Sequence, residues 1–363
     1  MFEEEIAKRI LEIERKKAGP FLLQLNPTNR CNLKCKFCWL RDFDKGGLNL
    51  DEISTARYKK LIKEAKQLKV KVIEITGGGE PLMRKDLLTL MKSIKRSNIF
   101  GRLITNGTLF TEKMIKELIK IGWDEIVFSL DAPNKKINNF LRGGGFDEAV
   151  KALRSFQLRK FKNKKEKPKI SIHMVLCNKN YHLLPKMFEF AYELNCKNLL
   201  VEPIVLLAKK TKAGKELMFK KKDRKKLMKA IKEASQFAYQ HNFQTNVDKL
   251  GYELIEHTSR MKKIVEKEGK KEKNPMLSIP CYQPFYSLII RPWGDVGPCC
   301  MFESSFENIK SKSLKQIWFS KYFEEIRENM KRKKLPEFCS KCNPSQIQTN
   351  RKIRENLRVV LNG

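Results

Sequence analysis

Short apolar runs alternate with amphipathic stretches along the first part of the chain. Each apolar run has the length of a β-strand, and each following stretch has helical periodicity. The runs that we interpret as strands are residues 21–26, 70–76, 101–106, 125–130, 169–176 and 197–203. The helical patterns between and around them cover residues 51–68, 85–97, 111–121, 146–160 and 183–194.

Strands that alternate with helices at short loop spacing form a parallel sheet with crossover helices. Six strand–helix units are too few for a closed eight-fold barrel. The predicted fold is therefore α/β, a partial (β/α)6 TIM-like barrel that stays partly open. Chemistry in such sheets collects at the carboxyl ends of the strands.

The remaining pattern predicts further units on either side of this barrel. Within the smaller unit, residues 286–296 predict a hairpin that turns at Gly294, and residues 313–334 predict one amphipathic helix. The predicted organisation is an N-terminal helix over 1–19, the barrel over 20–245, a linker over 246–275, a small C-terminal domain over 276–345 and a tail over 346–363.

Composition places the chain among cytoplasmic proteins. No apolar run is long enough to span a bilayer, and the N-terminus lacks the apolar stretch of a signal peptide. Ten cysteines in such a chain are unsuited to a disulfide framework, because the cytosol keeps thiols reduced. Eight of them fall in close groups, which indicates metal ligation, whereas Cys177 and Cys196 stand alone in apolar surroundings and predict core side chains.

The chain carries a net charge of +35, which suits an anionic partner. The lysines are spread along the whole sequence, and the densest runs lack interleaved aromatic residues for base stacking. A nucleic-acid partner is therefore an alternative that we do not favour.

Three cysteines, Cys31, Cys35 and Cys38, follow the first predicted strand in a C-x3-C-x2-C spacing. Three thiolates can hold three corners of a cubane iron–sulfur cluster and leave one iron open, as reactive metal sites require. Structural zinc would need a fourth ligand nearby, and the first histidine of the chain is His173.

This loop resembles the C-x3-C-x-aromatic-C motif of the radical S-adenosylmethionine (SAM) superfamily, with Phe37 at the aromatic position and Trp39 after it. The resemblance implies that the open iron of a [4Fe-4S] cluster binds the amine and carboxylate of SAM. It also implies reductive cleavage of SAM to a 5′-deoxyadenosyl radical, which abstracts hydrogen from a substrate.

Further positions match the SAM-binding motifs of that superfamily. The turn TGGGEP resembles its GGE motif, and the ends of the third and fourth strands supply polar side chains at the expected places. Asp131 is at least as well suited to capping the following loop. The cofactor-binding residues that the resemblance implies are Gly78, Gly79, Glu80, Asn106, Ser129 and Arg142.

Two other side chains lie where a barrel lumen would hold substrate. A lone histidine such as His173 is more often a satisfied core residue than a ligand. Glu202, at the end of the sixth strand, is a candidate for binding ribose or substrate.

A second group of cysteines lies near the C-terminus: Cys281, Cys299 after Gly294, and the knuckle Cys339–Cys342. Spacing alone favours zinc and an iron–sulfur cluster equally. The pattern resembles the SPASM and twitch extensions of radical SAM enzymes, which implies one auxiliary [4Fe-4S] cluster. Cys300 is left over; we favour a spectator, with an alternate ligand or a substrate-facing thiol as alternatives.

The resulting hypothesis is a radical SAM oxidoreductase whose auxiliary cluster accepts an electron from the substrate. The substrate would be an alcohol, a sugar or a peptide side chain, and a flavodoxin or ferredoxin would supply the first electron. The alternatives are an RNA-base-modifying radical SAM enzyme and a non-catalytic iron–sulfur or zinc metalloprotein.

Overall fold

The computed structural model describes residues 2–14, 18–38, 40, 51–204, 216–250, 281–300, 302, 305–332, 334, 339 and 344–362. Among these residues a nine-stranded sheet runs in the order β7-β6-β5-β4-β3-β2-β1-β8-β9. Each neighbouring pair from β7 to β8 is parallel, and β9 pairs with β8 in the antiparallel sense.

All six predicted strands are present, each within two residues of its predicted limits. The strands are β1 (Leu22–Leu25), β2 (Val72–Ile75), β3 (Phe100–Thr105), β4 (Glu125–Ser129), β5 (Lys169–Leu176), β6 (Asn198–Pro203), β7 (Gln244–Thr245), β8 (Ser287–Ile290) and β9 (Val296–Gly297). The helices are α1 (Glu3–Glu14), α2 (Thr55–Gln67), α3 (Leu87–Arg96), α4 (Glu112–Lys120), α5 (Lys135–Arg142), α6 (Phe146–Lys162), α7 (Leu184–Glu193), α9 (Arg224–Gln240), α11 (Gln283–Tyr286), α12 (Leu314–Trp318), α13 (Lys321–Lys331) and α14 (Pro344–Asn362).

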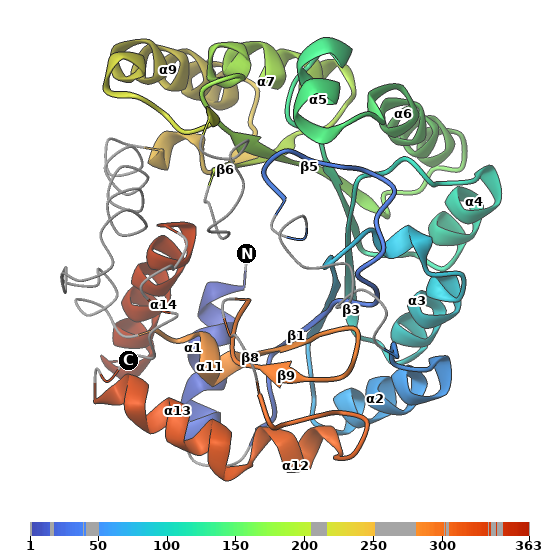
Figure 1. The fold of residues 1–363 in the computed structure, drawn as a ribbon, viewed down its shortest axis with the longest axis vertical. Helices are drawn as coiled ribbons and strands as arrows, with labels where there is room; N and C mark the ends of the chain where they lie inside the picture. The colour runs from blue at the N-terminus through green and yellow to red at the C-terminus, as the bar shows by residue number, and fades with distance from the viewer. Residues whose placement is uncertain are drawn as a thin grey trace.

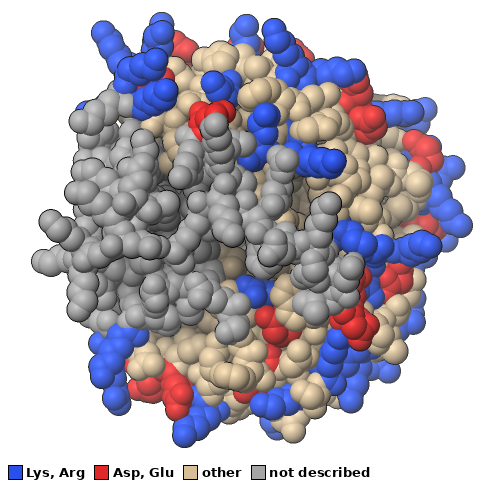
Figure 2. Space-filling model, viewed as in Figure 1, with Lys and Arg blue, Asp and Glu red and all other residues tan. Residues whose placement is uncertain are grey.

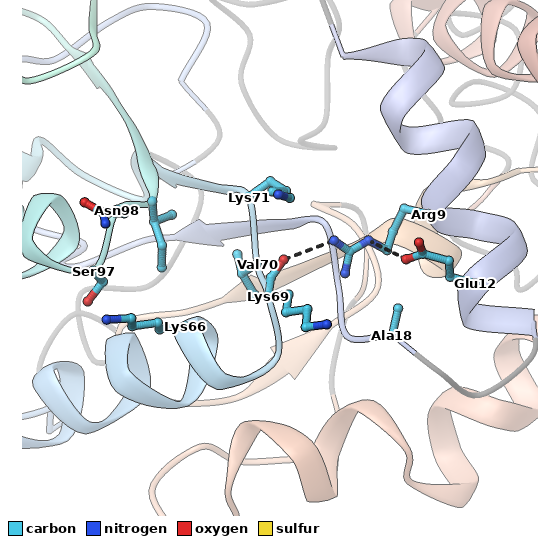
Figure 3. Close-up of a pocket in the computed structure, with 10 residues that line it drawn as sticks. Arg9, Glu12, Ala18, Lys66, Lys69, Val70, Lys71, Ser97 and Asn98 are labelled. Atoms are coloured by element: carbon cyan, nitrogen blue, oxygen red, sulfur yellow. Dashed lines mark hydrogen bonds and ion pairs between the residues drawn. The ribbon is translucent and has the colours of Figure 1, made fainter.

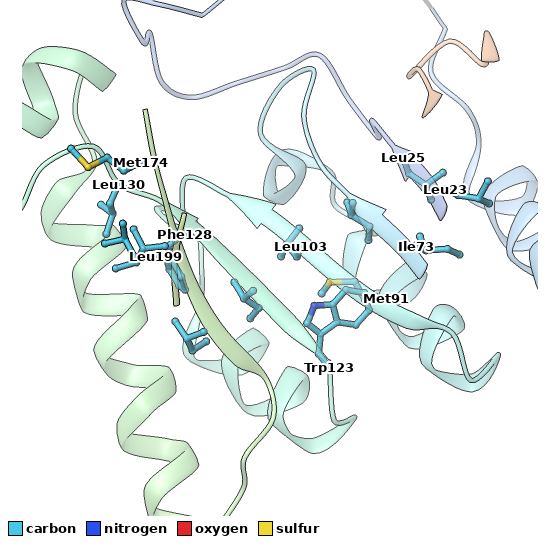
Figure 4. Packing of buried hydrophobic residues seen from close by; sticks show 14 of the residues in the cluster. Leu23, Leu25, Ile73, Met91, Leu103, Trp123, Phe128, Leu130, Met174 and Leu199 are labelled. Carbon is cyan, nitrogen blue, oxygen red and sulfur yellow. The ribbon is translucent and has the colours of Figure 1, made fainter. Parts of the chain in front are cut away.

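The sheet is curved, and its crossover helices cover the outer face (Figure 1). Alternate residues of each strand, such as Leu23, Ile73 and Leu103, are fully buried in the core between sheet and helices (Figure 4). The other face of each strand therefore points toward the inside of the partial barrel, because successive side chains alternate between the two faces.

A hydrogen-bonded polar layer crosses this inner face of the sheet. Gln24 Nε2 donates to Glu74 Oε1 over 2.7 Å, and Arg102 bonds Glu74 at 3.1 Å and Glu125 at 2.7 Å. Ser171 Oγ donates to the other oxygen of Glu125 over 2.7 Å. Five adjacent strands, β1 to β5, are thereby tied together beneath the edge where chemistry is expected.

Helix α1 packs against the same inner side, below this layer. The ring of Phe2 lies 5.7 Å from that of Phe21 and 5.6 Å from that of Phe100, between ring centroids. Helix α14 packs in turn on α1, with Ile353 fully buried. The segment predicted as a C-terminal tail is thus a helix, and it helps to close the open side of the barrel.

The C-terminal unit continues the sheet. Strand β8 pairs with β1 in parallel, and the predicted hairpin is confirmed, with Gly294 at a φ of 101° in its turn. The single helix predicted over 313–334 is wrong. Ser320 accepts a hydrogen bond from the backbone of Phe323 and begins a new helix, so the segment divides into α12 and α13.

Most of the predicted linker, residues 251–275, lies outside the described residues. No helix among the described residues combines the length and apolar character needed to cross a bilayer. On the face drawn in Figure 2, lysine and arginine side chains are distributed around the described surface and do not gather in one patch.

Candidate functional site

The cysteine loop begins where β1 ends, at the carboxyl edge of the sheet. None of its three cysteines forms a disulfide bond; Cys31 is exposed, and Cys35 and Cys38 are half-buried. The backbone N–H of Lys36 donates to the carbonyl of Leu141 over 2.8 Å, so helix α5 supports the middle of the loop. Trp39 lies outside the described residues.

The glycine turn after β2 runs directly alongside this loop. The N–H of Gly79 donates to the carbonyl of Thr28, and the N–H of Glu80 to that of Arg30, both over 2.8 Å. A Cβ at Gly79 would lie 2.0 Å from the carbonyl oxygen of Arg30, and one at Gly78 would lie 1.9 Å from Oδ1 of Asn29. Only glycine permits this approach, which brings the two predicted motifs into contact.

Glu80 is the centre of a buried hydrogen-bond network. Its Oε1 accepts from Thr105 Oγ1 at 2.6 Å and from the N–H of Leu82 at 3.0 Å. Its Oε2 accepts from the N–H of Asn106 at 2.8 Å. Burial raises the pKa of Glu80 in spite of these hydrogen bonds, so a cation placed beside the carboxylate would favour its charged form.

Asn106 connects the end of β3 to the cysteine loop. Its Nδ2 donates to Asn32 Oδ1 at 2.9 Å, and Asn32 donates in turn to Thr108 Oγ1 at 2.8 Å. Asn106 therefore orients the loop through Asn32. Sequence reasoning missed Asn32; its position between the first two cysteines is the one available signal.

Arg142 is buried beneath the loop and paired with Asp131. Its Nε lies 2.7 Å from Oδ2 of Asp131, and its Nη2 donates to Oδ1 over 3.2 Å. The guanidinium carbon lies 5.8 Å from the ring centroid of Phe37. Asp131 also accepts from the N–H of Val175 at 2.8 Å, so it holds Arg142 and does not merely cap a loop.

Ser129, the last residue of β4, lies beside His173 in the middle of β5, in register with it. Burial and the nearby charge of Arg142 lower the pKa of His173 to about 4, so its imidazole is neutral at pH 7. Its Nε2 is buried and has no hydrogen-bond partner among the described residues. The prediction of a satisfied core histidine is not met.

The three loop thiols interact electrostatically with one another. Burial raises the pKa of Cys35 to about 11, the charge of Arg142 opposes this, and Cys38 and Cys31 raise it further. No three His, Cys, Asp or Glu side chains among the described residues could hold one metal ion. In a [4Fe-4S] cluster each thiolate binds a different iron, so the three thiols of this loop could each hold one iron of a single cluster.

Among the described C-terminal thiols, Cys281 interacts electrostatically with Cys339 and with Cys300. Cys281 and Cys339 are buried in one apolar cluster that includes residues of α1. Burial raises the pKa of Cys339 to about 12, and the charge of Cys281 raises it further. Burial likewise raises the pKa of Cys281, with a smaller contribution from the charge of Cys300. The charge of Cys299 contributes instead to the raised pKa of Tyr322. Cys342 lies outside the described residues.

The two candidate catalytic side chains, Cys300 and Glu202, interact electrostatically. Burial is the main cause of the raised pKa of Cys300, and the charge of Glu202, near the end of β6, contributes to a smaller extent.

A separate cavity of about 660 Å³ lies at the opposite end of the strands (Figure 3). Arg9 of α1 borders it, donating to the carbonyl of Lys69 over 3.1 Å and pairing with Glu12 at 3.3 Å. Because the cavity adjoins the segments that precede β2 and β3, it is remote from the cysteine loop. We therefore exclude it as the SAM site.

The curved parallel sheet with a three-thiol loop at its carboxyl edge defines a cluster-binding α/β enzyme fold. Family models agree: residues 25–191 match the radical SAM superfamily, and residues 281–343 match the SPASM iron–sulfur cluster-binding domain. The chain belongs to the radical SAM superfamily and carries a SPASM-type domain. The cofactors of these domains are SAM, a [4Fe-4S] cluster and an auxiliary [4Fe-4S] cluster.

Curated relatives match part of the chain. The tungsten-containing aldehyde ferredoxin oxidoreductase cofactor-modifying protein of Pyrococcus furiosus is 28% identical over 191 residues, covering 51% of this chain and 52% of its own. The mycofactocin maturase MftC of Mycolicibacterium smegmatis is 31% identical over 149 residues, covering 41% and 37%. The chain thus spans about half or less of the length of these relatives.

Among solved structures, Streptococcus suis SuiB bound to the precursor peptide SuiA has the same fold. Its TM-score is 0.64 at 20% identity, and the match covers 88% of this chain and 70% of SuiB. At this identity the likeness establishes the fold alone.

Proposed function

We propose that the protein is a radical SAM oxidoreductase that oxidises an organic substrate by two electrons. Three thiolates of the loop after β1 would hold the SAM-binding cluster, and four C-terminal thiolates would hold the electron-accepting one. The ligands are Cys31, Cys35 and Cys38 for the first cluster and Cys281, Cys299, Cys339 and Cys342 for the second.

The observation that carries the proposal is the pairing of β8 with β1. The two strands are parallel neighbours in the register Leu22 to Ser287 and Leu25 to Ile290. One belongs to the barrel and leads into the first thiol group, and the other follows Cys281. Both thiol groups therefore flank neighbouring strands of one continuous sheet, an arrangement that supports the proposed electron transfer between two centres.

The residues around the loop suit the polar end of SAM. Glu80 would accept its cationic amine, and Arg142, oriented by Asp131, would bind its carboxylate together with Ser129. Gly78 and Gly79 keep the backbone close enough for the ligand to reach the cluster. When bound, the reduced cluster supplies the electron that cleaves SAM to methionine and the 5′-deoxyadenosyl radical.

A peptide side chain is the substrate class that we favour over an alcohol or sugar. The positive charge of the chain suits an acidic peptide. One relative is named a maturase, and SuiB, which shares the fold, is bound to a precursor peptide. In this reaction the substrate loses a hydrogen atom, then a proton and an electron, for which Glu202 is the candidate proton acceptor and the auxiliary cluster the electron acceptor.

Anaerobic reconstitution tests the proposal. The wild type should bind about eight irons per chain, and the Cys31/Cys35/Cys38→Ala variant about four, as expected for two [4Fe-4S] clusters. With dithionite, or with flavodoxin as reductant, only the wild type should release 5′-deoxyadenosine. The matched control is Cys196→Ala, which removes a buried core thiol and should leave about eight irons.

The outcomes separate the alternatives. About four irons, with zinc in the C-terminal domain, would be consistent with a radical SAM enzyme but would exclude an auxiliary iron–sulfur cluster as the electron acceptor. Intact clusters without SAM cleavage, even when acidic peptides are added, would favour a non-catalytic iron–sulfur protein. Cleavage that RNA stimulates and peptides do not would favour base modification.

A further inference from the structure

Helix α14 brings a buried asparagine to the first cysteine of the C-terminal group. Asn350 is 0% exposed, and its Oδ1 accepts a hydrogen bond from the backbone N–H of Tyr282 over 3.0 Å. Because Tyr282 directly follows Cys281, the Asn350 amide lies beside that cysteine. The backbone donor also fixes the amide orientation, since an N–H must face an oxygen.

The other end of this amide is unsatisfied. Nδ2 of Asn350 is buried and has no hydrogen-bond partner among the described residues. A buried donor without a partner destabilises the fold, so it calls for an explanation such as a redox role or a group that binds there. The sulfur of Cys281 is the candidate acceptor for this donor, because the oxygen of the same amide is held by the N–H of Tyr282, the residue that follows Cys281.

The surroundings make this donor distinctive. Cys281 and Cys339 lie in a cluster formed otherwise by apolar and aromatic residues, among them Ile10 of α1 and Ile353 of α14. A neutral thiol is a weak hydrogen-bond acceptor, whereas a thiolate is a strong one. The partner of Asn350 Nδ2 is therefore supplied when Cys281 becomes a cluster ligand.

We infer that Asn350 donates a hydrogen bond from Nδ2 to the cluster-bound sulfur of Cys281 and thereby raises the reduction potential of the auxiliary cluster. The inference rests on the proposed function, in which Cys281 is a ligand. Hydrogen bonds to cluster sulfurs favour the reduced, more negative state. Asn350 is in this sense a positioning and tuning residue, and it would make the auxiliary cluster a better electron acceptor.

The test is a redox titration of the full-length, reconstituted protein, with each cluster followed by its electron paramagnetic resonance signal. Asn350→Leu removes the donor at nearly constant volume. Asn350→Asp keeps the acceptor for Tyr282 and replaces the donor with an oxygen. The matched control is Asn356→Ala, an asparagine of the same helix whose Nδ2 bonds the carbonyl of Lys352 over 3.0 Å.

Loss of one hydrogen bond to a charged sulfur should shift the reduction equilibrium of the auxiliary cluster about tenfold toward the oxidised form, or about 59 mV for one electron. Both Asn350 variants should show this shift, and the SAM-binding cluster and the Asn356 variant should not. About eight irons with an unchanged auxiliary potential would overturn the inference and leave the proposed function intact. About four irons in the wild type would overturn the auxiliary cluster itself.

A measurement on the wild type covers the case in which both variants lose the cluster. Protein that contains 15N-labelled asparagine should show a coupling between the reduced auxiliary cluster and one 15N nucleus in electron–nuclear double resonance. The Asn356→Ala variant should keep this coupling. Its absence from wild-type protein would overturn the inference.

Discussion

Glu80→Gln is the substitution that tests the centre of the site most directly, because it replaces one oxygen of a carboxylate in which both oxygens accept hydrogen bonds. The carboxylate is 3% exposed and accepts from Thr105, Leu82 and Asn106 at 2.6, 3.0 and 2.8 Å. A carboxylate accepts at both oxygens, whereas a glutamine amide accepts at one and donates at the other. One donor must therefore face another donor in the variant.

The favoured orientation keeps the amide oxygen where Oε1 receives two hydrogen bonds and turns the NH2 toward the N–H of Asn106. The variant then loses one hydrogen bond to a charged acceptor, worth about 1.5–3 kcal/mol. Part of this loss is offset, because burial raises the pKa of Glu80 and the neutral amide avoids that desolvation. We expect the free energy of unfolding to fall by about 1–2 kcal/mol at pH 7.

The pH dependence has a definite sign. The pKa of Glu80 in the folded protein lies above its ordinary value of 4.5, so the folded state binds this proton more tightly than the unfolded state. The contribution of Glu80 to the free energy of unfolding of the wild type therefore increases as the pH falls from the raised pKa toward 4.5. Glutamine does not titrate, so the stability difference between the two proteins should widen on acidification.

Denaturant unfolding of both cluster-free proteins, followed by circular dichroism at about pH 7.5 and about pH 5, measures this difference at two pH values above 4.5. Thr105→Val is the matched control, because it removes a single donor to Oε1 and leaves the carboxylate. A Glu80→Gln variant as stable as the wild type at both pH values would refute the hydrogen-bond argument. A difference that narrowed on acidification would refute the sign of the pKa shift.

Three further predictions concern other parts of the fold. Arg102→Met leaves two buried carboxylates without their counter-charge and should lower the free energy of unfolding by about 3–5 kcal/mol in denaturant titration. Gly79→Ala places a Cβ 2.0 Å from the carbonyl oxygen of Arg30, so reconstitution should yield about four irons fewer, whereas the fold measured by circular dichroism should persist. Cys299→Ser should lose the auxiliary cluster and Cys300→Ser should keep it, as iron analysis will show; the reverse result would make Cys300 the ligand.

The strand pattern was predictable because the outer face of every barrel strand is apolar and the flanking helices are amphipathic. The SAM-side candidates were predictable for a related reason: parallel strands place their carboxyl ends at one edge. Glu80, Asn106 and the cysteine loop, distant in sequence, consequently meet there in the structure.

Other contacts depend on register and packing, which residue patterns do not encode. Arg102 lies opposite Glu74 and Glu125 only because β2, β3 and β4 pair in one particular alignment. The sequence predicts a tail where helix α14 lies, because the polar residues of this segment obscure the short apolar face that packs on α1. The hydrogen bond between Asn350 and the backbone of Tyr282 depends on that packing, and no sequence motif predicts it.

The register of β1 and β8 also limits how the two thiol groups can be arranged. The loop cysteines follow the carboxyl end of β1, whereas Cys281 precedes the amino end of β8. Because the strands are parallel and begin opposite one another, Cys281 precedes this strand pair at its amino end and the loop cysteines follow it at its carboxyl end. The hydrogen bonds between β1 and β8 therefore fix where each segment joins the sheet. The residues between the strands and the cysteines determine where the thiols themselves lie, so the distance between the two thiol groups depends on loop packing that the strand register alone does not determine.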